Sequence, residues 1–161
     1  MEVMEMEVFV KPEAGDKWFE YWRKEMLRWY VDVMGLNPER LRFVDHPKAG
    51  LSHYSKQTTD IEYDFPFGWG ELEGIADRTD YDLRVHQQHS KVDLTYLDPA
   101  TNVRNLPCAI EPADSVNLIL TTLLLDASDQ AVCHNNPRVG LHRNPPVTPD
   151  PLAVRARPLA P

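Results

Sequence analysis

The feature that most constrains the fold is a run of alternating residues that starts near Thr58. From residue 60 to residue 65, acidic and apolar side chains alternate in the order Asp-Ile-Glu-Tyr-Asp-Phe. A repeat of two residues is typical of a strand that is buried on one face. Pro66 ends this strand because proline cannot donate to a central ladder. The sequence FGWG then turns the chain, and a second alternating strand begins at Glu71.

The second strand, Glu71 to Ala76, contains Gly74 and is followed closely by Arg78. A glycine inside a strand weakens a sheet, and it often marks a place where a ligand or another backbone comes close. Acidic side chains beside this glycine and arginine indicate a small polar pocket built on the sheet. The simpler interpretation from the residues alone is an acidic face exposed to solvent.

The chain before this stretch predicts one strand and one helix. Residues 4–10 alternate and predict a strand. The next element is a helix capped by Asp16 that runs to Met34, with Gly35 as its stop. One apolar stripe recurs at spacings of three and four along it: Phe19, Trp22, Met26, Trp29 and Val33. Such a stripe predicts packing against a sheet, rather than a platform for stacking nucleic-acid bases.

The remaining elements are shorter. An edge strand is expected over 41–44, a polar loop over 46–56, and a helix over 79–89 capped by Thr79 or Asp80. His86 and His89 share a face of that helix, but a metal site needs further ligands. Residues 91–97 predict a strand with three side chains inward: Val92, Leu94 and Tyr96. A loop follows to residue 107.

The last elements predicted are a strand over 108–111 and a helix. Pro112 suits the first turn of that helix, and its leucines predict burial on nearly all sides: Leu118, Leu120, Leu123, Leu124 and Leu125. After Asp126 periodicity disappears and prolines accumulate. We therefore divide the chain into a domain over 1–133 and a disordered tail over 134–161.

Composition limits the class of protein. The 161 residues suffice for one domain with a core. A net charge of -8 lacks the basic footprint of a nucleic-acid binder, although the tail is locally basic. Cys108 and Cys133 match no metal or redox spacing, and no apolar run is long enough to cross a bilayer. We expect a cytoplasmic protein with reduced thiols and no membrane partner.

Several segments together resemble one family. The central stretch TTDIEYDFPFGWGELEGIADRTDYDL is similar to the catalytic domain of glycyl-tRNA synthetase, a class II aminoacyl-tRNA synthetase. Similarity continues in WFEYWRKEMLRWY, in LSHYSKQTTD and in IEP, from about Glu5 to Asp126. The resemblance implies an α+β fold, a partial class II catalytic domain with a mostly antiparallel sheet flanked by helices. It places the tail where the anticodon-binding domain would begin.

The resemblance also implies an activity and its partners. The family uses ATP to activate glycine and transfers it to tRNA-Gly, and its members are homodimers. Activation drives the glycine carboxylate onto the α-phosphorus of ATP, which requires cations at the triphosphate, carboxylates for Mg²⁺ and a pocket for the amino acid. Residues implied for glycine are Glu5 in motif 2 and Arg78, Glu111 and Ala113. Those implied for ATP are Glu71, Leu72, Ser115 and Leu118, with Glu71 acting through Mg²⁺.

Departures from the family pattern predict a loss of activity. Relatives read EPSAG, then an apolar residue, Asp and Arg, where this chain reads EPADSVNL. Leu118 thus replaces an arginine that clamps ATP, Ala113 replaces a serine and Ser115 a glycine. A second phosphate-clamping arginine and motif 1, which forms the dimer, would precede residue 1. We expect that this chain alone cannot make glycyl-adenylate. The alternatives are a non-catalytic binding or regulatory module and an unstable gene fragment.

Overall fold

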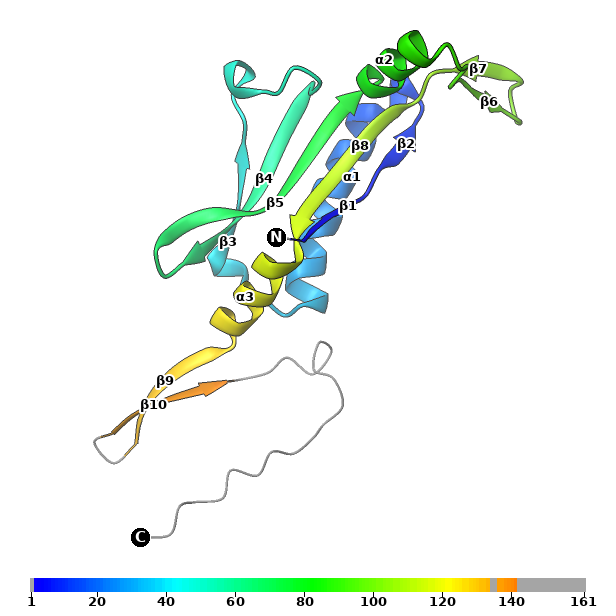
Figure 1. Ribbon diagram of the computed structural model, residues 1–161. Helices are drawn as coiled ribbons and strands as arrows, with labels where there is room; N and C mark the ends of the chain where they lie inside the picture. The colour runs from blue at the N-terminus through cyan, green and yellow to red at the C-terminus, as the bar shows by residue number, and fades with distance from the viewer. Residues whose placement is uncertain (1, 134–135, 142–161) are drawn as a thin grey trace.

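A computed structural model describes residues 2–133 and 136–141 and shows a six-stranded sheet with a long helix along one face (Figure 1). The predicted α+β class with a mostly antiparallel sheet is confirmed. The sheet and its helices consist of β1 (Val3–Glu5), β2 (Val8–Val10), α1 (Gly15–Arg28), β3 (Leu41–Asp45), β4 (Gln57–Phe65), β5 (Gly68–Thr79), α2 (Tyr81–Ser90), β8 (Cys108–Ser115) and α3 (Val116–Asp126). Short helical turns are η1 (Pro12–Ala14), η2 (Trp29–Val33), η3 (Pro38–Arg40) and η4 (Lys48–Gly50).

The strands of the sheet are antiparallel, in the order β1-β8-β5-β4-β3, and β2 also pairs with β8. The predicted hairpin is the β4–β5 pair, and β3 is the predicted edge strand. Strands β5 and β8 therefore lie at the centre, where side chains from several neighbours can meet.

The N-terminal strand differs from the prediction because it consists of two segments, β1 and β2, instead of one. Both pair with β8, and the gap between them lies opposite Pro112. The N–H of Met6 donates to the Pro112 carbonyl at 3.0 Å. Because proline has no N–H to return, the ladder is interrupted at this point.

The assignment of Pro112 to a helix was also wrong. It lies inside β8, and the helix begins four residues later at Val116. Ser115 caps that helix, since its hydroxyl accepts a hydrogen bond from the Leu118 N–H at 3.5 Å. Pro112 is tolerated inside β8 because the side of the strand where its N–H is missing faces the gap between β1 and β2.

Helix α1 begins one residue before the predicted cap. Ala14 precedes it, and Asp16 lies within the first turn, where its carboxylate accepts from Lys56 at 2.6 Å. The turn η1 leads into α1 without a break, so no side-chain cap is made. Gly35 ends the helical segment with a φ of 73°, as predicted from glycine's tolerance of left-handed backbone.

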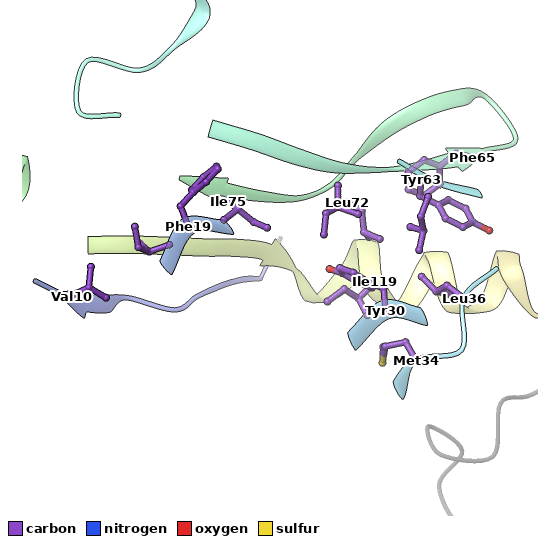
Figure 2. Packing of buried hydrophobic residues seen from close by; sticks show 13 residues of the cluster. Val10, Phe19, Tyr30, Met34, Leu36, Tyr63, Phe65, Leu72, Ile75 and Ile119 are labelled. Atoms are coloured by element: carbon purple, nitrogen blue, oxygen red, sulfur yellow. The ribbon is translucent and has the colours of Figure 1, made fainter. Parts of the chain in front are cut away.

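The predicted apolar stripe packs on the sheet except at its end. Phe19 is buried, but Val33 is 40% exposed and Tyr30 is fully buried instead. The last turn, η2, is a π-helix, whose wider spacing rotates the following side chains. Figure 2 shows the resulting core gathered between the β4–β5 hairpin and the segment that carries Tyr30 and Met34.

Strand β5 contains a bulge that decides which carboxylates share a face. Ile61 of β4 pairs with Glu73, whereas Glu62 pairs with Glu71, so Leu72 is an extra residue. Simple alternation places Glu71 and Glu73 on one face. The bulge turns them to opposite faces, with Glu73 toward the core and 1% exposed.

Helix α3 is not buried on all sides as predicted. Ile119 is buried, but Leu120 and Leu124 are 56% and 50% exposed. These two leucines are four residues apart and therefore share one helical face. In this chain that face is turned to solvent, while the face carrying Ile119 packs on the sheet.

The segment 91–97 is not an inward-facing strand. Only β6 (Tyr96–Asp98) forms, paired with β7 (Val103–Asn105) in a hairpin outside the main sheet (Figure 1). Val92 and Tyr96 are exposed instead of facing the core. Asp80 precedes α2 as expected. His86 and His89 of this helix are both exposed.

The C-terminal part holds a second hairpin, β9 (Ser128–Cys133) with β10 (Asn136–Leu141). Of the tail predicted over 134–161, the structure describes only residues 136–141, and the rest lies outside the described residues. Among the helices of the described ranges, none combines the length and apolar character required to span a bilayer.

Candidate functional site

The central strands present their smallest residues on the face turned away from α1. Side chains alternate along a strand, so Gly74 and Ala76 lie on the face opposite to buried Ile75. Gly74 pairs with Ala113 of β8, and Ala76 pairs with Glu111. This part of the sheet is a floor without large side chains. We call this surface the open face.

Carboxylates flank the floor on both sides. Asp60 of β4 pairs with Gly74, and Glu5 of β1 pairs with Ala113, so the two acidic residues belong to one row across the sheet. His46 contacts Asp60 through Nε2 at 2.7 Å from Oδ2. The residues in the middle of the row have no side chain beyond Cβ, and the charges therefore stand at its ends.

Arg78 lies at one end of the open face, where β5 leads into α2. Its Nη1 donates to Glu111 Oε2 at 2.6 Å, and its Nε donates to Asp82 Oδ2 at 2.7 Å. The guanidinium carbon lies 4.1 Å from the centre of the Tyr54 ring. The hydrogen bond from Arg78 lowers the pKa of Asp82. These contacts hold a half-buried guanidinium in a fixed orientation.

Glu7 completes this cluster. It lies between β1 and β2, at the position opposite Glu111 in the register with β8. Burial, followed by a hydrogen bond with Glu111, raises the pKa of Glu7 to about 7. Three carboxylates therefore surround one guanidinium. We call Glu7, Arg78, Asp82 and Glu111 the Arg78 cluster.

The residues predicted to bind the substrate glycine are brought together only in part. Arg78 and Glu111 are in direct contact, and Ala113 is two residues further along β8 on the same face. Glu5 is exposed, and its side chain makes no ion pair or hydrogen bond within the described part of the chain. Sequence alternation places Glu5 and Glu7 on one side of the chain, so the pattern contained a signal for Glu7. The choice of Glu5 depended on the resemblance.

A cavity of about 270 Å³ lies at the other end of the open face. It gathers all four residues predicted to contact ATP and one predicted to contact glycine: Glu71, Leu72, Ser115, Leu118 and Ala113. Val3 and Asp114 complete the lining. The lining residues include two carboxylates and no cationic side chain, which is an unfavourable environment for a triphosphate.

Comparison with known proteins shows what this chain is similar to. No protein-family model matches the chain. It is 50% identical over 153 residues to the glycine–tRNA ligase of Caldanaerobacter subterraneus subsp. tengcongensis, covering 95% of this chain and 33% of that protein. The glycine–tRNA ligase of Thermobifida fusca is 46% identical over 161 residues, covering 95% and 35%. That of Nocardia farcinica is 52% identical over 129 residues, covering 78% and 28%.

The chain is a homologue of part of glycine–tRNA ligase. It spans about a third of the length of the curated relatives it matches. These relatives confirm the resemblance to glycyl-tRNA synthetase that the motifs of this chain indicated.

In this homologue of glycine–tRNA ligase, a second pair of carboxylates lies over the floor. A Cβ added to Gly74 would lie 3.3 Å from Glu71 Oε1 and 3.7 Å from Asp60 Oδ1, so both oxygens overhang the glycine. Partial burial, followed by the charge of Asp60, raises the pKa of Glu71. The described residues contain no group of three or more metal-ligating side chains. Mg²⁺ commonly uses only one or two carboxylates, together with phosphate oxygens and water. Glu71 could supply one such carboxylate.

Behind the cavity, the core face of this glycine–tRNA ligase homologue holds further acidic groups. Glu73 pairs with Asp114 across β5 and β8, and the Tyr30 hydroxyl lies beside them. Burial, followed by the charge of Asp114, raises the pKa of Glu73 to about 8. Burial also raises the pKa of Asp114. The cavity end of the open face thus has buried acid behind it as well as carboxylates in its lining.

Proposed function

We propose that this chain forms the surface of a glycine–tRNA ligase catalytic domain on which glycine and ATP meet, for the ATP-dependent charging of tRNA-Gly. The observation that supports this proposal is that most of the predicted residues form two groups at opposite ends of the β5–β8 pair. Arg78 and Glu111, which are predicted to contact glycine, lie at one end. The residues predicted to contact ATP line a cavity at the other end. The names of the homologues agree with this assignment.

Glycine sets a particular demand on its site. It has no side chain to bind, so selection depends on its charged groups and on the exclusion of larger amino acids. Arg78 would orient the glycine carboxylate, and Glu111 would receive the ammonium. Ala76 and Ala113, which pair with Glu111 and Gly74, add no more than a methyl group each to this surface.

ATP would contact Leu72 and Leu118 at the cavity, and Glu71 would hold Mg²⁺. When bound, Mg²⁺ neutralises the charge that develops on the phosphate oxygens. The carboxylate of Glu71 would orient the ion, and Asp60 beside it would carry the hydrogen bond to His46. Since the lining provides no cation, we expect ATP to bind only in the presence of Mg²⁺.

The same cavity supports the prediction that the chain alone does not form glycyl-adenylate. Leu118 is apolar where the family pattern has a phosphate-clamping arginine, and removal of such a group typically reduces rate by orders of magnitude. Glycine-dependent exchange of pyrophosphate into ATP tests this point. We expect no exchange above a reaction without glycine, and robust exchange would overturn our interpretation of Leu118.

A non-catalytic binding module is the second candidate, and the charge-paired Arg78 cluster favours it. Robust exchange would support an active ligase, and titration calorimetry with glycine, and separately with Mg²⁺-ATP, tests the binding module. Glycine binding without exchange is expected for a module that retains the site and lacks the reaction. Failure to bind either substrate would contradict both candidates.

A further inference from the structure

Tyr54 belongs to the loop between η4 and β4, and its ring lies against the guanidinium of Arg78. The guanidinium carbon is 4.1 Å from the centre of the ring. Arginine stacks on aromatic rings because the negative face of the ring attracts the delocalised positive charge. The Arg78 side chain is only 19% exposed, so water weakens this attraction less than it would at the surface. Tyr54 therefore contributes to holding the guanidinium in place.

The hydrogen bonds of Arg78 leave one of its nitrogens available. Nε donates to Asp82 and Nη1 donates to Glu111, whereas no hydrogen bond or ion pair of Nη2 occurs within the described part of the chain. The five N–H groups of a guanidinium point outward in one plane. A stacked ring contacts the flat side of that plane and does not compete with bonds made in the plane. Tyr54 can thus hold Arg78 while Nη2 donates to a ligand.

Backbone contacts fix the position of the Tyr54 loop on the sheet. The N–H of Lys56 donates to the Asp77 carbonyl of β5 at 2.9 Å. The hydroxyl of Ser55 donates to the Gln57 carbonyl of β4 at 2.8 Å. These bonds attach the residues after Tyr54 to the same end of β5 that carries Arg78. The ring therefore stands on a supported segment of backbone.

A second aromatic contact joins this loop to α2. The ring of His53 packs edge-to-face against Tyr54, at a distance of 5.3 Å between ring centres, and against Tyr81, at 5.1 Å. Tyr81 is the first residue of α2, and Asp82 follows it. The loop that stacks on Arg78 and the helix that accepts its hydrogen bond are therefore in contact with each other.

We infer that Tyr54 is a positioning residue of the glycine site, whose ring holds the Arg78 guanidinium in the orientation in which Nη2 donates to the carboxylate of the substrate. This inference rests on the proposed function, in which Arg78 orients that carboxylate. The contact uses the ring and not the phenolic hydroxyl. Without the ring, the bonds to Glu111 and Asp82 remain, but water gains access to one side of the guanidinium and competes with the ligand.

Calorimetric titration of the full chain with three ligands tests this role. Glycine has both charged groups, glycolate keeps only the carboxylate, and glycinamide keeps only the ammonium. We expect Tyr54→Leu to bind glycine and glycolate about tenfold more weakly, as for the loss of a partly buried cation–π contact. Glycinamide should bind Tyr54→Leu and the parent chain equally, because it has no carboxylate for Arg78. Tyr54→Phe keeps the ring and should match the parent chain with all three ligands.

The matched control is Trp69→Leu. Trp69 also has an arginine over its ring, with the Arg42 guanidinium carbon at 4.1 Å, but it lies beside the β4–β5 turn at the other end of β5. This variant should bind the three ligands as the parent chain does. If Tyr54→Leu does not fold, NMR of the Arg78 Nε–H provides the test. Its signal should carry a ring-current shift in the parent chain and in Tyr54→Phe, and it should move on addition of glycolate and not of glycinamide.

Three results overturn the inference and leave the proposed function intact. The first is parent-like affinity of Tyr54→Leu for glycine and glycolate. The second is an equal loss for glycolate and glycinamide, because Tyr54 would then support the whole site rather than Arg78. The third is an Arg78 signal without a ring-current shift. A parent chain that binds neither glycine nor glycolate would instead overturn the proposed function and this inference together.

Discussion

The two ends of the open face differ in how their charges are compensated. At the Arg78 end, one guanidinium is bound by two carboxylates and stacks on an aromatic ring. At the cavity end, the lining contains Glu71 and Asp114 without a cation, and Glu73 is buried behind them. Both ends are built on the same two strands, so the sheet scaffold does not explain the difference.

This comparison shows that two parts of one sheet can differ in charge compensation although they share the same strands. Side chains that pair with each other hold their orientation without a ligand, as Arg78 and Glu111 do. At the cavity end, in contrast, no cationic side chain of the lining compensates Glu71 and Asp114. Four predictions follow from the contrast between the two ends.

The largest effect is expected for Arg78→Met, which would break the compensated end. Removal of one partner of a buried ion pair leaves its carboxylates uncompensated, and we expect a loss of about 3 kcal/mol in the free energy of unfolding. Glycine affinity should fall by at least about a hundredfold. Denaturant unfolding and calorimetry measure the two effects. Arg84→Met, which removes an exposed ion pair to Asp80, is the control and should change little.

A pH dependence of stability is expected from the acid behind the cavity end. The pKa of Glu73 is about 8 in the folded chain against an ordinary value of 4.5. The folded state therefore keeps a proton that the unfolded chain has lost, and stability should fall by about 2 kcal/mol between pH 5 and pH 7. Burial of Asp114 adds to this trend.

Chemical denaturation at several pH values measures this slope. Glu73→Gln, which is neutral at every pH, should flatten it, whereas Glu20→Gln on the exposed side of α1 should leave it unchanged. A slope that persists in Glu73→Gln would show that another group titrates, and the uncompensated character of the cavity end would then need a different explanation.

An intermediate effect is expected from Leu118→Arg, which adds a cation to the uncompensated end. A charge-assisted hydrogen bond to phosphate should strengthen Mg²⁺-ATP binding about tenfold. The matched control is Leu120→Arg, on the exposed face of the same helix. Equal gains in both variants would indicate general attraction by positive charge, and the cavity would then have no special role.

The smallest effect is expected at Gly74, which lies between the two ends. Gly74→Ala places a Cβ at 3.3 Å from the end of the flexible Glu71 side chain, which can move aside. We expect a change of less than about 1 kcal/mol in stability and similar small losses in glycine and Mg²⁺-ATP affinity. Gly50→Ala in η4 serves as the control. A loss confined to one ligand would show that the floor serves only one end.

Features that depend on neighbouring residues were predicted from the sequence, and features that depend on distant residues were not. The alternation from residue 60 to 65 predicted β4, and the glycine stop at residue 35 was found because both depend on neighbouring residues. Non-local effects were missed. The split of the first strand depends on its pairing with Pro112 of β8, and the exposure of Leu120 depends on which elements pack around α3.

The candidate site shows the same division. Motifs identified Arg78 and Glu111, and the structure brings them to 2.6 Å. The motifs did not identify Glu7 or Tyr54, which join Arg78 from distant parts of the chain. Likewise, the sequence grouped Glu71 with Glu73, and only the bulge at Leu72 separates them between the open face and the core.

The sequence by itself determined the family, the hairpin at the centre and the identities of the charged groups, because these are properties of the residues and their spacing. Tertiary structure alone decided which charges meet. Strand register, a bulge and a proline-interrupted ladder place one carboxylate beside a guanidinium and another in the apolar core. The energy of a charge depends on its distance to other charges and to water, and the fold sets those distances.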